Sequence, residues 1–225
     1  MKRVYLHPLA LRIWHWANAL IVIILIITGI QVRLSGMASI RPHDPALVIH
    51  KYIGWLMIAS FIFWLSYGLA THTLRRNYTI APRDLPGMLR QIKYYLVLIF
   101  KGEENPFRPS PEGKFNPLQK MAYSSVMGIF APVLIITGLL FIDISLLRKY
   151  VLLWDIAKIV NAIHVAGAYI FVLYLIIHIY MATVGRTVFS HIKAMIVGYE
   201  EEPEAGDAEQ STPAGASAES GNPSV

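Results

Sequence analysis

Two histidines, His164 and His178, lie fourteen residues apart within one long apolar segment. In an α-helix this spacing is about 3.9 turns and a rise of roughly 21 Å, so both imidazoles lie on nearly the same face, one near each side of a bilayer. His15 and His50 lie near the start of two other apolar segments. Ionisable side chains inside a membrane span are costly and usually functional. Four histidines at two depths therefore predict two metal centres stacked across a membrane.

The segments that must position these histidines have the composition of a membrane protein. Of the 225 residues, 55% are hydrophobic and only 15% are charged, and the mean hydropathy is +0.49. Four apolar segments are long enough to cross about 30 Å of hydrocarbon: residues 11–32, 47–69, 121–144 and 159–184. The first lacks the small-residue cleavage site of a signal peptide. We predict an all-α membrane protein with a four-helix transmembrane bundle.

The basic residues indicate the orientation of the spans. Lys2, Arg3 and Arg12 precede or open the first span, and the segment 70–120 is also rich in Lys and Arg. Cytoplasmic loops carry such an excess, so we predict a multi-pass protein of the bacterial cytoplasmic (inner) membrane with both termini in the cytoplasm. The charges flank spans and form no single stripe, so the net charge of +6 gives no reason to expect nucleic acid binding.

Two segments outside the spans have their own character. Residues 85–100 have helical apolar spacing with interleaved basic residues, which predicts an amphipathic helix on the cytoplasmic membrane surface. Residues 199–225 are rich in Glu, Ala, Ser, Gly and Pro, which predicts a disordered acidic cytoplasmic tail. Residues 1–198 then form one four-span domain.

In this topology the histidines fall into two pairs at matched depths. His15 and His178 form an inner pair near the cytoplasmic side, and His50 and His164 form an outer pair. Two imidazoles at one height can ligate a haem iron from both sides. Because the chain has no cysteine, iron–sulfur clusters and covalently attached c-type haem are excluded. The sequence therefore predicts two non-covalent haems b.

Three alternative roles for the histidines fit less well. A single histidine of this kind is more often a core or interfacial residue bonded to the backbone than a metal ligand. Four histidines at matched depths favour metal ligation over that structural role. A proton relay would not require matched pairs, and relays usually add buried carboxylates. Zinc needs three or four ligands at one site.

Four strings in order support a resemblance to a known family: IWHW at residues 13–16, LVIH at 47–50 followed by Gly54, GKFNPLQKM at 113–121 and IHIYMA at 177–182. The chain resembles the four-helix dihaem cytochrome b (gamma) subunit of membrane-bound formate dehydrogenases. It is also similar to the wider group that contains the b-type cytochrome of nickel–iron hydrogenases and bacterial cytochromes b561. The resemblance covers about residues 12–198.

The resemblance implies that the four histidines ligate two haems b. It also implies a site for menaquinone or ubiquinone at the cytoplasmic end, where Asn116 and Gln119 match polar positions of the family. From the residues alone, Asn116 is a helix N-cap and Gln119 its capping partner, and both roles are compatible. At Pro117 and Leu118 the family more often has a small residue and a glycine. The larger side chains of this sequence leave less room beside the expected quinone site.

Iron with two imidazole ligands has no vacant position, which favours electron transfer over oxygen chemistry. The expected protein is a membrane-anchoring subunit that passes electrons from a periplasmic catalytic subunit and an iron–sulfur subunit to quinone at the cytoplasmic side, with substrate chemistry in the partner and no catalytic residue of its own. The alternatives are a standalone cytochrome b561-type quinol oxidase, and a haem-free transporter or scaffold with a histidine proton relay.

One string occurs twice, because residues 25–29 and 134–138 both read LIITG in spans that run in the same direction. The repeat is either a coincidence in a membrane sequence of low diversity or a structural feature. In the second case, Gly29 and Gly138 allow close approach of a flat macrocycle or a neighbouring helix. Five residues do not decide between them.

Overall fold

Four long helices form the body of the computed structural model, which describes residues 2–35, 44–82, 84–103, 105–107, 115–142, 151–184 and 187–202. Helices α1 (Leu9–Leu34), α2 (Pro45–Ala70) and α8 (Val151–Thr183) each span the bundle. The fourth spanning helix is α5 (Pro117–Ser125) continued through η3 (Val126–Phe130) into α6 (Ala131–Ile142). Within the described residues these four are long and apolar enough to cross a membrane. The predicted all-α transmembrane bundle is confirmed.

The starts of two spanning helices follow from local sequence. Pro45 opens α2 after Asp44, whose carboxylate accepts a hydrogen bond from the amide of Ala46 at 2.9 Å. Pro117 opens α5 after Asn116 in the same way. Proline has no N–H to satisfy at the first helical position, and an Asp or Asn cap takes up one of the free amides of the first turn.

The third spanning helix changes its winding part-way. Residues Val126–Phe130 form a π-helical turn, η3, and Pro132 follows in the first turn of α6. Proline cannot donate the bond that an α-helix would direct to the carbonyl of Gly128, which favours a wider turn at this point.

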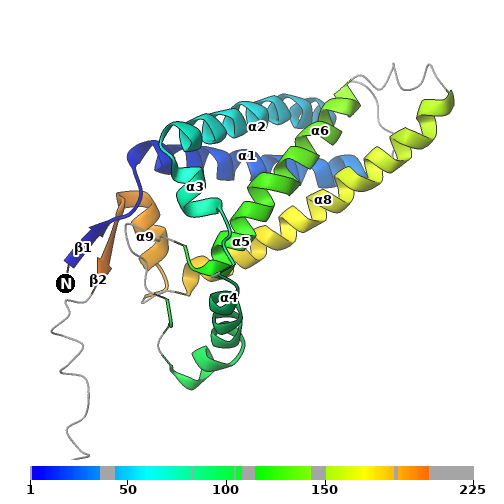
Figure 1. Cartoon of the computed structure of the whole chain (residues 1–225). Coiled ribbons are helices and arrows are strands. Elements are labelled where there is room, and N and C mark those ends of the chain that lie inside the picture. The colour runs from blue at the N-terminus through cyan, green and yellow to red at the C-terminus, as the bar shows by residue number, and fades with distance from the viewer. Residues whose placement is uncertain are drawn as a thin grey trace, which may run out of the picture.

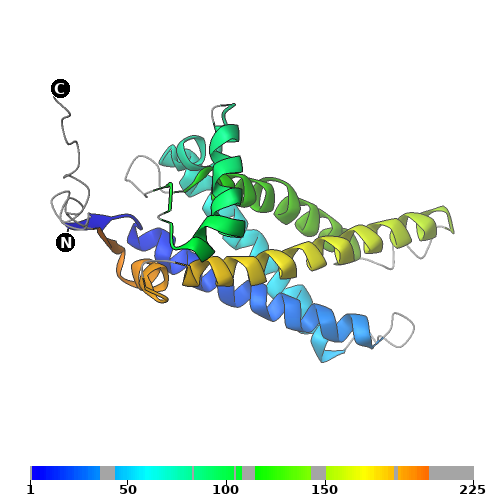
Figure 2. The same ribbon diagram turned by 90° about the horizontal axis from the view of Figure 1, so that it is seen from below.

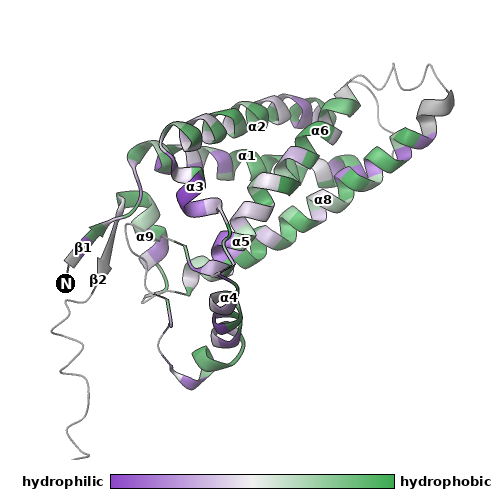
Figure 3. Cartoon of the chain, in the orientation of Figure 1, coloured by the Kyte–Doolittle hydropathy of each residue, from purple (hydrophilic) through white to green (hydrophobic). Residues whose placement is uncertain are grey.

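The spanning helices are arranged as two antiparallel pairs, α1 with α2 and α6 with α8, and the pairs cross one another (Figures 1 and 2). Apolar residues cover most of these helices (Figure 3). Large side chains on their outer faces are exposed, such as Leu20 at 60% and Ile176 at 61%. A surface of this kind suits lipid rather than water.

Short elements gather at the end of the bundle that carries both β strands (Figure 1). Helix α3 (Thr73–Tyr78) follows α2. The predicted amphipathic helix is present as α4 (Asp84–Lys93), the π-turn η1 (Tyr94–Leu98) and the 3-10 turn η2 (Ile99–Lys101). Gly102 ends this segment with φ of 75°, a conformation that glycine adopts without strain.

Residues near the start of the chain and residues that follow the last span meet at this same end. Strand β1 (Lys2–Tyr5) pairs antiparallel with β2 (Tyr199–Glu202), which follows helix α9 (Ser190–Val197). The register pairs Arg3 with Glu201 and Tyr5 with Tyr199. The first four residues of the predicted disordered tail are thus paired in a strand, and residues 203–225 lie outside the described residues.

Candidate haem centres

The inner pair joins the first and last spanning helices. His15 comes from α1 and His178 from α8, and their ring centroids lie 6.1 Å apart with an angle of 53° between the ring planes. Helix α1 places His15 two turns from its start, and α8 places His178 close to its end. Both positions lie toward the end of the bundle that carries the strands.

The outer pair has nearly the same geometry further along the bundle. His50 comes from α2 and His164 from α8, with ring centroids 6.3 Å apart and 73° between the planes. Helix α8 thus contributes one histidine to each pair. The pairing expected from depth, His15 with His178 and His50 with His164, is the one that the structure brings together. The role of these residues as iron ligands stays a prediction.

These separations fit an iron bound between two imidazoles. Metal–imidazole bonds of about 2 Å on each side, together with the radius of each ring, give a centroid separation of roughly 6 Å. Within the described part of the chain, no group of three or more His, Cys, Asp or Glu residues comes together. Each site therefore offers two protein ligands, which is what a porphyrin leaves open on its iron.

The surroundings of the imidazole rings differ between the two pairs. Nδ1 of His15 is buried and has no hydrogen-bond partner among the described residues. A Cβ added to Gly29 would lie 3.4 Å from Cε1 of His50, and one added to Gly138 would lie 3.4 Å from Cε1 of His164. The two glycines of the LIITG repeat therefore let the outer imidazoles approach α1 and α6 closely.

Aromatic side chains that the sequence analysis did not single out surround the rings. Tyr174 stacks on His178 with centroids 5.6 Å apart at 19°, and Tyr123 lies 6.1 Å from the same ring. Phe141 meets His164 edge-on at 6.2 Å. Tyr174 precedes His178 by four residues, and helical spacing places such residues on one face, so this signal was available in the sequence. The contacts of Tyr123 and Phe141 required the packing of α5 and α6.

The two residues proposed for quinone binding form a capping box at the start of α5. The Asn116 side chain accepts from the amide of Gln119 at 2.8 Å, and the Gln119 side chain accepts from the amide of Asn116 at 3.2 Å. This confirms the cap expected from the residues. Asn116 is only 2% exposed, and its Nδ2 donates to the Tyr95 hydroxyl at 3.2 Å.

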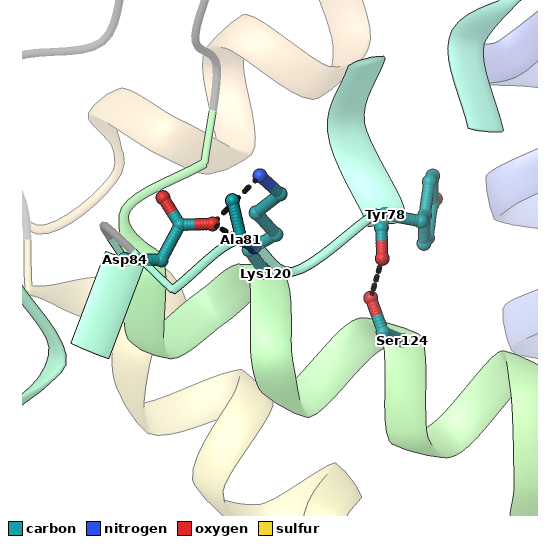
Figure 4. A network of polar contacts seen from close by, with 5 residues as sticks. All are labelled: Tyr78, Ala81, Asp84, Lys120 and Ser124. Atoms are coloured by element: carbon teal, nitrogen blue, oxygen red, sulfur yellow. Dashed lines mark hydrogen bonds and ion pairs between the residues drawn. The ribbon is translucent and has the colours of Figure 1, made fainter. Parts of the chain in front are cut away.

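A polar network beside this cap fixes the loop between α3 and α4 to α5 (Figure 4). One carboxylate oxygen of Asp84 accepts from the amide of Ala81 at 2.8 Å and from Nζ of Lys120 at 3.0 Å. The Ser124 hydroxyl donates to the carbonyl of Tyr78. The Asp84 and Lys120 side chains are 17% and 16% exposed, so the ion pair is largely sheltered from water.

Comparison with known proteins identifies the family of this chain. Residues 6–198 match the family described as prokaryotic cytochrome b561. The chain belongs to this family. This cytochrome is 32% identical over 207 residues to "Putative cytochrome YdhU" of Escherichia coli (strain K12), which covers 88% of this chain and 75% of the relative. It is 23% identical over 231 residues to "Probable Ni/Fe-hydrogenase B-type cytochrome subunit" of Cupriavidus necator, covering 88% and 87%.

Membership explains the coarse chemistry of this cytochrome. The family implies b-type haem and a role in electron transfer, and the four apolar helices make the cytochrome a multi-pass membrane protein. The expected resemblance to the wider cytochrome b561 and hydrogenase cytochrome group is confirmed.

Proposed function

We propose that this cytochrome holds two haems b, one between His15 and His178 and one between His50 and His164, and serves as the membrane anchor of a multi-subunit oxidoreductase. The observation that carries the proposal is the repetition of one geometry, since the centroid separations of the two pairs are 6.1 and 6.3 Å. Bound in this way, haem supplies one-electron transfer with no coordination position open to oxygen.

The chain's own residues set where each haem is held. Helix α8 sets the separation of the two sites, because His164 and His178 are a rise of roughly 21 Å apart along its axis. Each histidine of α8 faces one from a different helix, His178 facing α1 and His164 facing α2. The aromatic rings of Tyr174 and Phe141 pack beside the imidazoles and help to exclude water.

The absence of cysteine assigns part of the electron path to other polypeptides. An iron–sulfur cluster needs cysteine ligands, and this chain has none. We propose a periplasmic catalytic subunit with an iron–sulfur subunit at the end of the bundle near the outer pair, and both termini in the cytoplasm. A relative named as a hydrogenase cytochrome subunit supports a partnered role.

We place a site for menaquinone or ubiquinone at the opposite end, beside the inner pair. Phe115 lies next to Asn116 in sequence, and its ring centroid lies 4.8 Å from that of Tyr123. The ring of Tyr123 in turn lies beside that of His178. The buried Asn116 amide and the Tyr95 hydroxyl offer donors to a quinone carbonyl. Burial raises the pKa of the Tyr95 phenol, so it stays protonated and able to donate.

Two measurements test this function. Pyridine haemochrome analysis of the purified chain is expected to give two haems b per polypeptide, and one or none would overturn the assignment of the pairs. Mild solubilisation of native membranes is expected to co-purify a molybdenum, tungsten or nickel–iron subunit. Two haems in a chain that purifies alone with quinol oxidation activity would instead favour the standalone cytochrome b561-type enzyme.

A further inference from the structure

The LIITG string has the same neighbours at both of its positions. In α1, the hydroxyl oxygen of Thr28 lies 2.9 Å from Nδ1 of His50. In α6, the hydroxyl oxygen of Thr137 lies 2.8 Å from Nδ1 of His164. A Cβ added to the glycine that follows each threonine would lie 3.4 Å from Cε1 of the same ring in both cases. Coincidence does not account for two identical environments, so the repeat belongs to the outer pair.

The hydrogen bonds of Thr28 determine which partner supplies the proton. A threonine hydroxyl has one proton to donate and two lone pairs to accept with. The Thr28 hydroxyl donates to the carbonyl of Ile24 at 2.7 Å, and the carbonyl of Leu25 lies at 3.3 Å from the same oxygen. A carbonyl oxygen can only accept, so the proton of Thr28 is committed to the backbone. The hydroxyl must therefore accept from Nδ1 of His50, which has to carry a proton.

Thr137 repeats this arrangement. Its hydroxyl donates to the carbonyl of Val133 at 2.6 Å, with the carbonyl of Leu134 at 3.2 Å. Its remaining lone pair faces Nδ1 of His164. In a neutral imidazole only one nitrogen carries a proton. Protonation at Nδ1 leaves the lone pair of Nε2 free in both outer histidines.

We propose that Thr28 and Thr137 are positioning residues that fix the outer histidines as Nδ1–H tautomers and present Nε2 to a metal. The proposal rests on the proposed binding of haem at the outer pair. It assigns a role to both copies of the LIITG string, in which threonine orients the ring and glycine provides the space for it.

The inner pair is built differently. Nδ1 of His15 is buried without a partner in the described part of the chain, whereas both outer rings have a hydroxyl partner. A group that accepts the Nδ1 proton raises the basicity of the ligand and fixes its orientation, and its loss typically costs 10–100-fold in metal affinity. Removing the hydroxyls should therefore act on the outer haem alone.

The test compares Thr28→Val and Thr137→Val, singly and combined, with Thr28→Ser and Thr137→Ser in the full chain. Valine keeps the branched shape without the hydroxyl, and serine keeps the hydroxyl. Thr183→Val is a matched control, because the Thr183 hydroxyl also donates to a backbone carbonyl, that of Tyr180 at 2.7 Å, on an exposed face. The readouts are redox potentiometry of the two haems, electron paramagnetic resonance of the oxidised protein, and the rate of haem transfer to apomyoglobin.

In the valine variants we expect a more positive midpoint potential for the outer haem, because a less basic imidazole stabilises ferric iron less. We also expect an altered low-spin signal from that haem, because its ring planes are less constrained, and loss of that haem to apomyoglobin that is 10–100-fold faster. The inner haem should keep its potential and occupancy, which also shows that the variants fold. The serine variants and Thr183→Val should behave as the unaltered chain.

An outer haem that is unchanged in the combined valine variant would overturn the proposal. Equal effects on both haems would also overturn it, because the two hydroxyls contact only the outer histidines. Loss of the outer signal in the serine variants would overturn it as well, because serine keeps the hydroxyl. Failure of the proposed function has a different signature, since the unaltered chain would then contain fewer than two haems.

Discussion

The imidazole rings of His15 and His178 lie with their centroids 6.1 Å apart, although they come from the first and the last spanning helices. The outer pair, by contrast, joins α8 to α2. Each proposed haem therefore depends on a different pair of helices, and α8 is common to both. This makes the two centres separable by single substitutions.

Single substitutions of the histidines should remove the haems one at a time. His164→Ala should abolish the outer haem and leave the inner one largely intact, and His178→Ala should do the reverse. His15→Ala should match His178→Ala, and His50→Ala should match His164→Ala. Haem content and low-temperature absorption spectra of the four purified variants measure this. If His15→Ala and His50→Ala disturbed the same haem, the pairing would be wrong even with the count correct.

Substitution of the repeat glycines should separate helix stability from retention of the outer haem. Alanine favours a helix over glycine by about 1 kcal/mol, so Gly29→Ala and Gly138→Ala should not lower the stability of their helices. The new Cβ would lie 3.4 Å from Cε1 of the outer imidazole, at the short limit of ordinary van der Waals contact, so we expect at most a slight shift of the ring and a modest weakening of outer haem retention. Thermal unfolding and haem occupancy measure the two effects, with the inner haem as the internal control. A lower unfolding temperature together with loss of both haems would contradict this expectation.

Substitution of Asn116 should slow the reaction with quinone. Asn116→Leu should leave both haem spectra and their reduction by the partner's substrate intact, and slow reoxidation by menaquinone analogues, because a hydrogen bond worth about 0.5–1.5 kcal/mol is lost. It also removes the cap of α5, which costs about 0.5–2 kcal/mol of stability.

Asn116→Asp is the matched variant for separating these effects. It keeps an oxygen that can accept from the amide of Gln119 and removes the amide that donates to Tyr95. Slow reoxidation in both variants would indicate the amide, and slow reoxidation in Asn116→Leu alone would indicate the cap. Unchanged reoxidation in both, with inhibitor density beside His50 and His164, would move the quinone site to the other end of the bundle.

Truncation of the C-terminus should distinguish the contribution of strand β2 from that of residues 203–225. A chain ending at residue 202 keeps the β1–β2 pairing, whereas a chain ending at residue 198 loses it. Only the shorter chain should become sensitive to trypsin after Lys2 and Arg3, because β1 then has no partner strand. Timed proteolysis with mass spectrometry measures this, and haem content should stay the same in both chains. Equal cleavage of both chains would show that the pairing does not protect the N-terminus.

The sequence alone determined the features that depend on spacing along one helix. The apolar segments, the depths of the four histidines and the capping box of Asn116 and Gln119 follow from helical rise and from hydrogen bonds within a few residues. Hydrophobic length fixes depth in a bilayer closely enough to sort the histidines into the pairs that lie together in the fold.

Only the tertiary structure decided what faces each histidine. The sequence left the LIITG repeat open between coincidence and a site for close approach, and the contacts of Thr28 with His50 and Thr137 with His164 were not predicted. It also missed the pairing of Tyr199–Glu202 with β1. The physical reason is the same in each case. Helix rotation and crossing are set by packing between distant segments, and no spacing along one segment carries that information.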